Sequence, residues 1–219
     1  MNIKSILLAV SSLSVLAGES TPVFSASRPG NANPSSTLSK GHFMLEASSD
    51  VASDDFDSYL QLRYGLHHRA ELYIVQPINN ITNQSLGAVS IAFKLANEQG
   101  FIPEIGAHFS INNPTNFSND IDISIPFSHS LPQGFNIGGQ FGPDFGSDNI
   151  SYTIYLGKSI SDKLWSFVEI YNDSGLMFDT GLTYMIKDNV QLDTNLGLSL
   201  DGNDDETFIN FGIAWMFPF

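Results

Sequence analysis

The chain has 219 residues, and its 23 Asp plus Glu against 9 Lys plus Arg give a formal net charge of -14. So much negative charge repels the phosphates of nucleic acid, which excludes nucleic-acid binding from the candidate functions. The absence of cysteine also removes disulfide frameworks and thiolate metal sites. The length fits a single all-β barrel domain.

The N-terminus has the three-part pattern of an export signal. Lys4 supplies a positive charge, residues 6–16 form a short apolar core interrupted by serine, and residues 15–17 (VLA) offer a cleavage site. Residues 25–27 (SAS) are a second candidate, which would place cleavage as late as residue 27. The apolar core is too short for a transmembrane helix, which needs about 20 residues. We therefore predict a signal peptide over residues 1–17.

Residues 18–40 are rich in Ser, Pro, Asn and Gly and show no apolar periodicity. This composition predicts a flexible leader between the signal peptide and the fold. From residue 41 onward, short segments of alternating polarity recur between clusters of Asn, Asp, Gly, Ser and Pro, which is typical of many hairpins in series. We therefore assign residues 41–219 to the folded domain.

About twelve of these segments read as strands. Each is close to the 9–11 residues that a tilted strand needs to cross a bilayer, and an even number is typical of bacterial barrels. The expected strands lie near residues 41–48, 58–66, 70–77, 86–95, 101–111, 120–130, 134–142, 150–159, 164–171, 176–186, 189–199 and 207–219.

The expected connections are of two alternating kinds. Short turns such as residues 66–69 and 187–189 alternate with mostly longer, acidic or Asn-rich segments such as 49–57, 112–119 and 201–206. Both termini fall on the side of the short turns. Outer-membrane barrels have short periplasmic turns and longer extracellular loops, whereas a soluble sandwich has no reason to separate its loops in this way.

The strands also sort their side chains by face, because successive residues of a strand point to opposite sides. A half-buried soluble sheet shows the same alternation, but the export signal, the sorted loops and the lack of helical segments favour an apolar face turned to lipid. We predict a transmembrane antiparallel up-and-down β-barrel of the outer-membrane type, located in the outer membrane of a Gram-negative bacterium. In the last strand the apolar face carries Ile209, Phe211, Ile213, Trp215, Phe217 and Phe219, and the other face carries Asn210, Gly212, Ala214 and Met216.

The C-terminal strand also resembles the insertion signal that the barrel assembly machinery reads. It ends on an aromatic residue and has apolar residues at every second position before it. The residues of this predicted signal are Ile213, Trp215, Phe217 and Phe219. The expected partners of the barrel are this machinery during insertion, and afterwards the outer-membrane lipids and lipopolysaccharide.

Four stretches resemble the family of small outer-membrane transporters named for a MetA pathway of phenol degradation. They are residues 60–74 (LQLRYGLHHRAELYI), 92–111 (AFKLANEQGFIPEIGAHFSI), 151–172 (SYTIYLGKSISDKLWSFVEIYN) and 178–199 (FDTGLTYMIKDNVQLDTNLGLS). The resemblance implies a transport-type barrel and does not identify a solute. The ending, residues 215–219 (WMFPF), departs from the family's usual aromatic-basic-aromatic close, and Pro218 also removes one ladder donor.

By the same parity, polar and charged residues should line the lumen. One interpretation is structural, with Arg63 and Lys94 pairing with neighbouring carboxylates to fill a narrow interior. The other is functional, with the same residues lining a path that selects solutes by charge. The expected lumen residues are Glu46, Gln61, Arg63, Glu71, Lys94, Glu104, His108, Asp122, Glu169, Asp179, Asp193 and Asn195.

Barrel size and lumen charge together suggest a function. Eight strands leave a filled interior and sixteen to eighteen leave an open channel, so about twelve strands predict a narrow or gated pore. The acidic excess favours cations or neutral small solutes, with hydrophobic or aromatic compounds among the candidates. No catalytic residue, cofactor or metal site is assigned, and the acidic segment 201–206 lacks the ligand spacing of an EF-hand.

Two alternatives stay open. His108 and Ser110 lie two apart on one strand, as a lipid esterase of the outer membrane would need for a His base to activate a Ser nucleophile. Parity places both in the lumen, although the ester substrate would lie in lipid. The other alternative is a structural membrane anchor without a pore.

Overall fold

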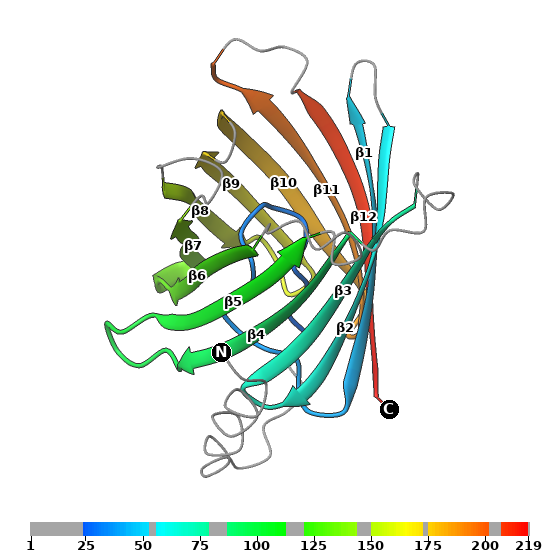
Figure 1. Ribbon diagram of the computed structural model, residues 1–219. Coiled ribbons are helices and arrows are strands. Elements are labelled where there is room, and N and C mark those ends of the chain that lie inside the picture. Colours follow the sequence, from blue (N-terminus) through cyan, green and yellow to red (C-terminus); the bar gives the residue numbers. More distant parts are fainter. Residues whose placement is uncertain are drawn as a thin grey trace.

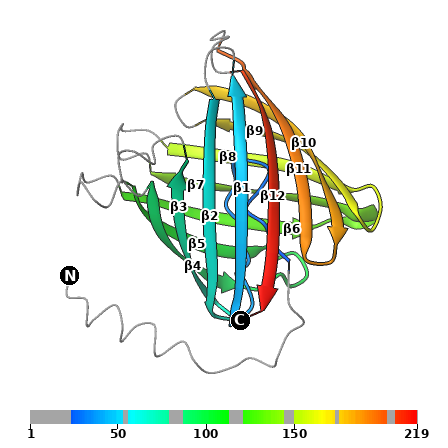
Figure 2. The same cartoon turned by 90° about the vertical axis from the view of Figure 1, so that its right-hand side faces the viewer.

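The fold is a closed barrel of antiparallel strands (Figure 1, Figure 2). The computed structural model describes residues 24–52, 56–78, 87–112, 121–143, 150–172, 175–201 and 207–218. Within these ranges the strands are β1 (His42–Ala52), β2 (Phe56–His67), β3 (Ala70–Pro77), β4 (Ala88–Ala96), β5 (Glu104–Asn112), β6 (Ile121–Ser130), β7 (Phe135–Pro143), β8 (Ile150–Ser159), β9 (Leu164–Asn172), β10 (Leu176–Lys187), β11 (Val190–Ser199) and β12 (Phe208–Pro218).

Each strand pairs with its neighbours in the chain, and β12 pairs with β1 to close the barrel. The closing register runs from His42 opposite Pro218 to Ala52 opposite Phe208. Closure is required because no water in the hydrocarbon core can bond the peptide groups of an open edge. The predicted up-and-down barrel of about twelve strands is therefore confirmed.

Some of the predicted strand boundaries are wrong. Residues 49–57 were expected to form a loop, but β1 runs to Ala52 and β2 begins at Phe56, so most of this segment continues the strand ladder. Polar side chains do not prevent pairing there, since a barrel wall can extend beyond the lipid. Conversely, β5 begins at Glu104 rather than at Phe101, because Pro103 has no N–H to donate.

The connections sort much as expected. Two residues join β2 to β3 and two join β10 to β11, and both connections lie at the end of the barrel where β1 begins and β12 ends. The link between β4 and β5, residues 97–103, is the exception at this end, being longer and carrying a bridge between Gln99 and Ile102.

A carboxylate ties this longer link to the neighbouring hairpin. The N–H and the hydroxyl of Ser130, at the end of β6, donate to the two carboxylate oxygens of Glu98 at 2.8 and 2.9 Å. The Ser130 N–H bond, which favours the charged form, lowers the pKa of the Glu98 carboxyl. These two hydrogen bonds between Ser130 and Glu98 therefore persist at acidic pH at which an ordinary glutamate would already be protonated.

The apolar face of the wall is turned outward. In β12 the side chains of Ile209, Phe211, Ile213 and Trp215 are between 43% and 57% exposed, whereas Asn210, Ala214 and Met216 are buried inside. The wall has no second sheet to cover this belt, so the belt faces lipid. A closed antiparallel barrel with such a belt is the architecture of the Gram-negative outer membrane, which confirms the predicted localisation.

Some predicted features lie outside the described residues. These are the signal peptide at residues 1–17, the start of the leader at residues 18–23, and Phe219 of the insertion signal. Its other members, Ile213, Trp215 and Phe217, belong to β12, and their role in insertion stays a prediction. None of the described residues forms a helix long and apolar enough to cross a membrane.

A charge on the lipid face should destabilise the barrel. We expect Ile213→Lys, at the middle of β12, to lower the free energy of unfolding by about 2–4 kcal/mol, because a lysine near the bilayer midplane must leave water. Urea unfolding of the protein refolded into vesicles measures this change. The control Ile213→Leu should leave the unfolding midpoint unchanged, and equal midpoints for the two variants would show that this face does not contact lipid.

Candidate functional site

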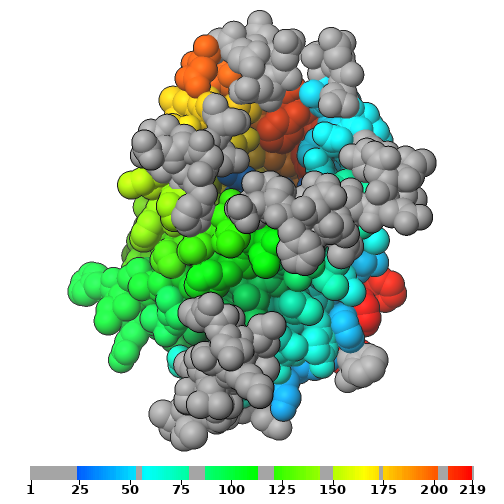
Figure 3. Space-filling model, in the orientation of Figure 1, coloured from blue at the N-terminus to red at the C-terminus, as the bar shows by residue number. Residues whose placement is uncertain are grey.

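The lumen is occupied by the chain's own N-terminal segment, residues 24–40, which we call the lumen segment. It contains no strand, and it runs inside the ring of strands before β1 begins (blue in Figure 1 and Figure 2). In the space-filling view, dark-blue atoms are visible in a recess bordered by yellow, red and cyan strands (Figure 3). The sequence indicated a flexible leader here and did not indicate the contacts that hold this part of it.

Carboxylates of the wall accept hydrogen bonds from the backbone of the lumen segment. Glu46 on β1 accepts the N–H of Ser27 at 3.2 Å. Glu169 on β9 accepts the N–H of Asn31 at 2.7 Å, and Glu71 on β3 accepts the N–H of Leu38 at 2.9 Å. Strands on opposite sides of the barrel thus bind the same short segment.

Donors on the wall bind backbone carbonyls of the segment in the same way. Arg63 donates to the carbonyl of Ser25 at 2.5 Å, and Gln191 donates to that of Arg28 at 3.1 Å. Gln140 both accepts the N–H of Asn33 at 2.9 Å and donates to the carbonyl of Asn31 at 3.2 Å. Several main-chain groups of the segment are therefore bonded by side chains of the wall and not by a neighbouring strand.

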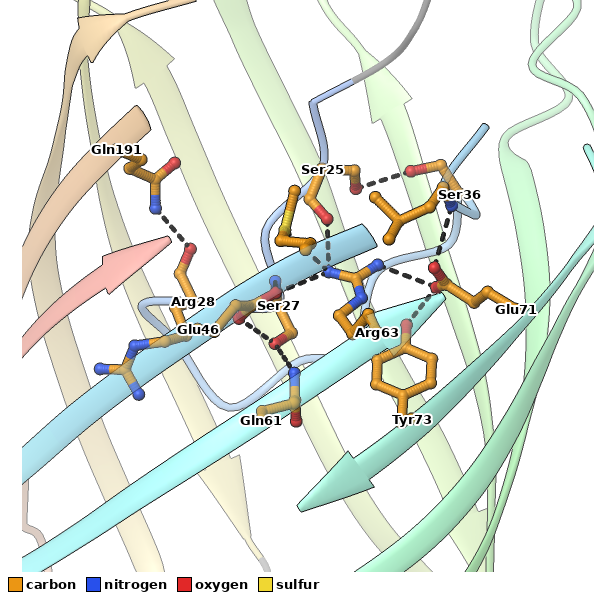
Figure 4. A network of polar contacts seen from close by, with 12 residues as sticks. Ser25, Ser27, Arg28, Ser36, Glu46, Gln61, Arg63, Glu71, Tyr73 and Gln191 are labelled. Atoms are coloured by element: carbon orange, nitrogen blue, oxygen red, sulfur yellow. Dashed lines mark hydrogen bonds and ion pairs between the residues drawn. The ribbon is translucent and has the colours of Figure 1, made fainter. Parts of the chain in front are cut away.

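Arg63 is the centre of the largest polar cluster (Figure 4). Its side chain is 0% exposed, and it lies 2.8 Å from Glu46 on β1 and 2.8 Å from Glu71 on β3. Tyr73 donates its hydroxyl to Glu71 and places its ring 4.7 Å from the guanidinium carbon. Because β2 lies between β1 and β3, the guanidinium reaches a carboxylate on each side, and the expected pairing of Arg63 with Glu71 is present.

Two further ion pairs lie in the lumen, one within the wall and one between the wall and the lumen segment. Lys94 on β4 pairs with Glu104 on β5, as the structural interpretation expected. Arg28 of the lumen segment lies 3.3 Å from Asp193 and also donates to Asn210. Arg28 was not foreseen as a lumen residue, because an isolated arginine in a Ser- and Asn-rich stretch gives no local signal.

The remaining predicted lumen residues fall in several places. Glu169 lies opposite Asp179 on the neighbouring strand, and Asn195 donates to Asp179 at 2.6 Å. Gln61 donates to the hydroxyl of Ser27 at 2.6 Å, close to the Arg63 cluster. His108 is buried with its ring 5.1 Å from that of Tyr73. Asp122 is exposed near the loop end of β6, where Asn112 donates to it.

The lumen segment separates cavities of different character. A cavity of about 470 Å³ lies where β8 ends and β9 begins, and its wall includes Tyr155, Trp165 and Phe167. Cavities of about 240 Å³ and 500 Å³ lie toward the long-loop end and are lined mostly by polar residues, including Asp50 and Asn112. The parity of β9 could have shown that Trp165 and Phe167 point inward with Glu169.

The geometry gives no support to a catalytic pair at His108 and Ser110. Ser110 donates its hydroxyl to Asn112 at 3.3 Å and accepts that of Ser90 at 2.9 Å, and no hydrogen bond to His108 is present in this described part of β5. Both residues are buried inside the barrel, away from lipid. Over the described ranges, no group of three or more His, Asp or Glu side chains is placed to hold a metal ion.

Comparison with known proteins places this geometry among bacterial barrels. A sequence model of the family described as "Putative MetA-pathway of phenol degradation" matches residues 26–217. The KdgM porin is 11% identical, with a TM-score of 0.60 over 80% of this chain and 99% of the porin. The Acinetobacter baumannii outer membrane protein Omp33 is 10% identical, with a TM-score of 0.52 over 82% of this chain and 99% of Omp33. At these identities the likeness shows the fold alone, and no curated protein sequence matches the chain.

Removing the guanidinium should leave two buried carboxylates without their cation. We expect Arg63→Met to lower the free energy of unfolding by about 3–5 kcal/mol, because uncompensated buried charge is costly. The exposed Lys187→Met is the control and should change it by less than about 0.5 kcal/mol. Urea unfolding in detergent micelles, followed by tryptophan fluorescence, measures both. If Arg63→Met is no worse than the control, the cluster contributes nothing to stability.

The contacts of the lumen segment also bear on signal-peptide cleavage. Cleavage after residue 27 would remove the groups that bond Arg63 and Glu46, whereas cleavage after residue 17 retains them. We therefore expect the mature protein to begin before Phe24. Intact mass measurement on protein exported by its own signal would show this, and a mature chain beginning at Arg28 would contradict it.

Proposed function

The chain belongs to the family described as "Putative MetA-pathway of phenol degradation", and from this membership and its lumen we propose that it is an outer-membrane channel for small solutes. The observation that carries the proposal is the lumen itself, which holds cavities on both sides of a single crossing segment. A structural anchor needs only a closed wall, and a tightly packed interior would serve it better.

The charge of the lumen supports a preference for cations or neutral solutes. The wall contributes the carboxylates of Glu46, Glu71, Glu104, Glu169, Asp179 and Asp193, against the cations of Arg63 and Lys94 on the wall and of Arg28 on the lumen segment. Among the described residues, no ion pair reaches Glu169 or Asp179, which are 2% and 1% exposed. Fixed negative charge in a confined path attracts cations and repels anions.

The aromatic cavity supports small hydrophobic or aromatic solutes. The rings of Trp165 and Phe167 are stacked with centroids 5.4 Å apart, and Tyr155 meets Trp165 edge to face at 6.2 Å. Inward-facing aromatic residues are unexpected in a wall whose lumen face is otherwise polar. Together with the carboxylate of Glu169 in the same cavity, they suit an aromatic body that carries a hydrogen-bond donor.

The relatives and the belt bear on solute and partners. One structure of the KdgM porin is a complex with disordered oligogalacturonate, but an acidic lumen disfavours such an anionic chain here. The outward apolar belt requires lipid around the barrel. We propose that the loop-side rim meets lipopolysaccharide and that the C-terminal strand is read by the barrel assembly machinery.

Planar-bilayer recording tests the channel and its selectivity together. We expect single-channel currents with a reversal potential that shows cation preference, and we expect Glu169→Gln to reduce that preference by about twofold because it removes one charge from the wall of the cavity of about 470 Å³. Asp188→Asn, in the turn after β10, removes the same charge outside the lumen and should have no effect.

Two outcomes would overturn the proposal in different ways. An anion preference would contradict the acidic path while leaving a channel. A complete absence of current from protein that refolds normally would favour the structural anchor.

A further inference from the structure

The contacts between the wall and the lumen segment have the features of a binding site and not only of a packed interior. We propose that the lumen wall is a binding site for an extended peptide, that residues 24–40 are its resident ligand, and that solutes pass when this ligand is released. The inference rests on the proposed channel function, since release matters only if something then passes.

The wall bonds the main chain of the segment as well as side chains such as those of Ser27, Arg28 and Asn33. Side chains from six strands bond its backbone: Glu46, Arg63, Glu71, Gln140, Glu169 and Gln191. Recognition through peptide N–H and C=O groups is how proteins bind extended peptides with little dependence on sequence. The chemical class that fits the site is therefore an extended peptide with mostly small, polar side chains.

The wall also has the shape that a peptide needs. Glycines face the lumen where the segment crosses β5 and β2: a Cβ on Gly106 would lie 3.0 Å from the carbonyl oxygen of Ser35, and one on Gly65 would lie 2.8 Å from the carbonyl carbon of Ser39. No larger residue fits at these two positions without moving the segment. At these two positions the wall thus admits the backbone of the segment only because a side chain is lacking.

Apolar contacts anchor the ends of the segment, while its middle is held by polar contacts. Leu38 packs in a buried cluster with Met44, Ala214 and Met216, against which Phe24 and Ala26 also pack. Between these anchors, residues 30–33 have cavities on both sides. Water can replace hydrogen bonds to a released middle at small net cost, so this part of the site can exchange its ligand.

A reversible covalent lock tests whether the segment must move. Ser35 of the segment and Ser128 of β6 have their hydroxyl oxygens 2.8 Å apart, and the chain has no cysteine of its own. We expect the oxidised Ser35→Cys/Ser128→Cys protein to pass about tenfold less current than the same sample after reduction, because a pinned segment blocks the path. Current recovered on reduction also shows that the variant is folded.

A wall-to-wall pair provides the matched control. Ser90 on β4 and Ser110 on β5 are both buried and have their hydroxyl oxygens 2.9 Å apart. Ser90→Cys/Ser110→Cys therefore forms a disulfide between two wall strands and does not attach the lumen segment to the wall. Its current should not depend on reduction. Equal currents from the oxidised and reduced lock overturn the inference and leave the channel intact. If neither the reduced lock nor the unmodified protein passes current, the channel is overturned, and this inference with it.

A synthetic peptide tests the site itself. In the full chain carrying Arg28→Gln and Leu38→Ala, which weaken one ion pair and one anchor, we expect more frequent openings. A peptide of residues 24–40, added to the bilayer chamber, should then block them. The same peptide N-methylated at Ser27, Asn31 and Asn33 lacks the N–H groups that donate to Glu46, Glu169 and Gln140. The methylated peptide should therefore need about a tenfold higher concentration to block the current equally. Equal block by both peptides would show that the backbone is not what the wall recognises.

Discussion

In the hydrocarbon core of a membrane no water is present to bond an unpaired peptide group, and the rest of this structure depends on that constraint. The pairing of β1 with β12 removes the two edges that the sheet would otherwise expose. Closure then divides every strand into a lipid face and a lumen face, because side chains alternate. The apolar belt and the polar lumen are therefore two results of one requirement.

Closure also confines the polar face, and confinement explains the arrangement of charge. A carboxylate in a narrow interior needs donors, since unpaired buried charge is costly. Glu46 and Glu71 obtain theirs from Arg63 and from the lumen segment. Glu169 has no cation in the described part of the chain and accepts the N–H of Asn31 instead. The lumen segment thus completes the solvation of the wall that holds it.

The barrel was predictable from the sequence because its signals are local. Alternation with a period of two, turn residues and strand length identify a strand without knowledge of its partners, so the expected 70–77 and 150–159 match β3 and β8. The alternation of side chains likewise placed Arg63 on the same face of the wall as Glu46 and Glu71. The limits of β1 were missed because Ser49 and Asp50 resemble loop residues, although they pair across the strands.

The lumen segment was not predictable in the same way. Its contacts join residues far apart in the chain, such as Arg28 and Asp193, which are 165 positions apart. Its Ser, Asn and Gly content suits a solvated leader, and it equally suits a segment whose backbone is hydrogen-bonded by side chains of the barrel wall. Composition alone cannot separate these two states, because the difference lies in the acceptors that the wall supplies.

In the proposed channel, the division of the lumen by the lumen segment links the position of this segment to solute selectivity. On one side of the segment the path is aromatic, with Trp165 and Phe167, and on the other it is polar. Release of the segment removes an N–H donor from Glu46, which stays paired with Arg63, and from Glu169, which has no cation among the described residues. In the channel that we propose, the carboxylates that bind the segment are thus also those that would attract a cation after its release. A solute able to satisfy these carboxylates offsets the loss of the segment's N–H groups, so the best-bound solutes would also be those that favour opening.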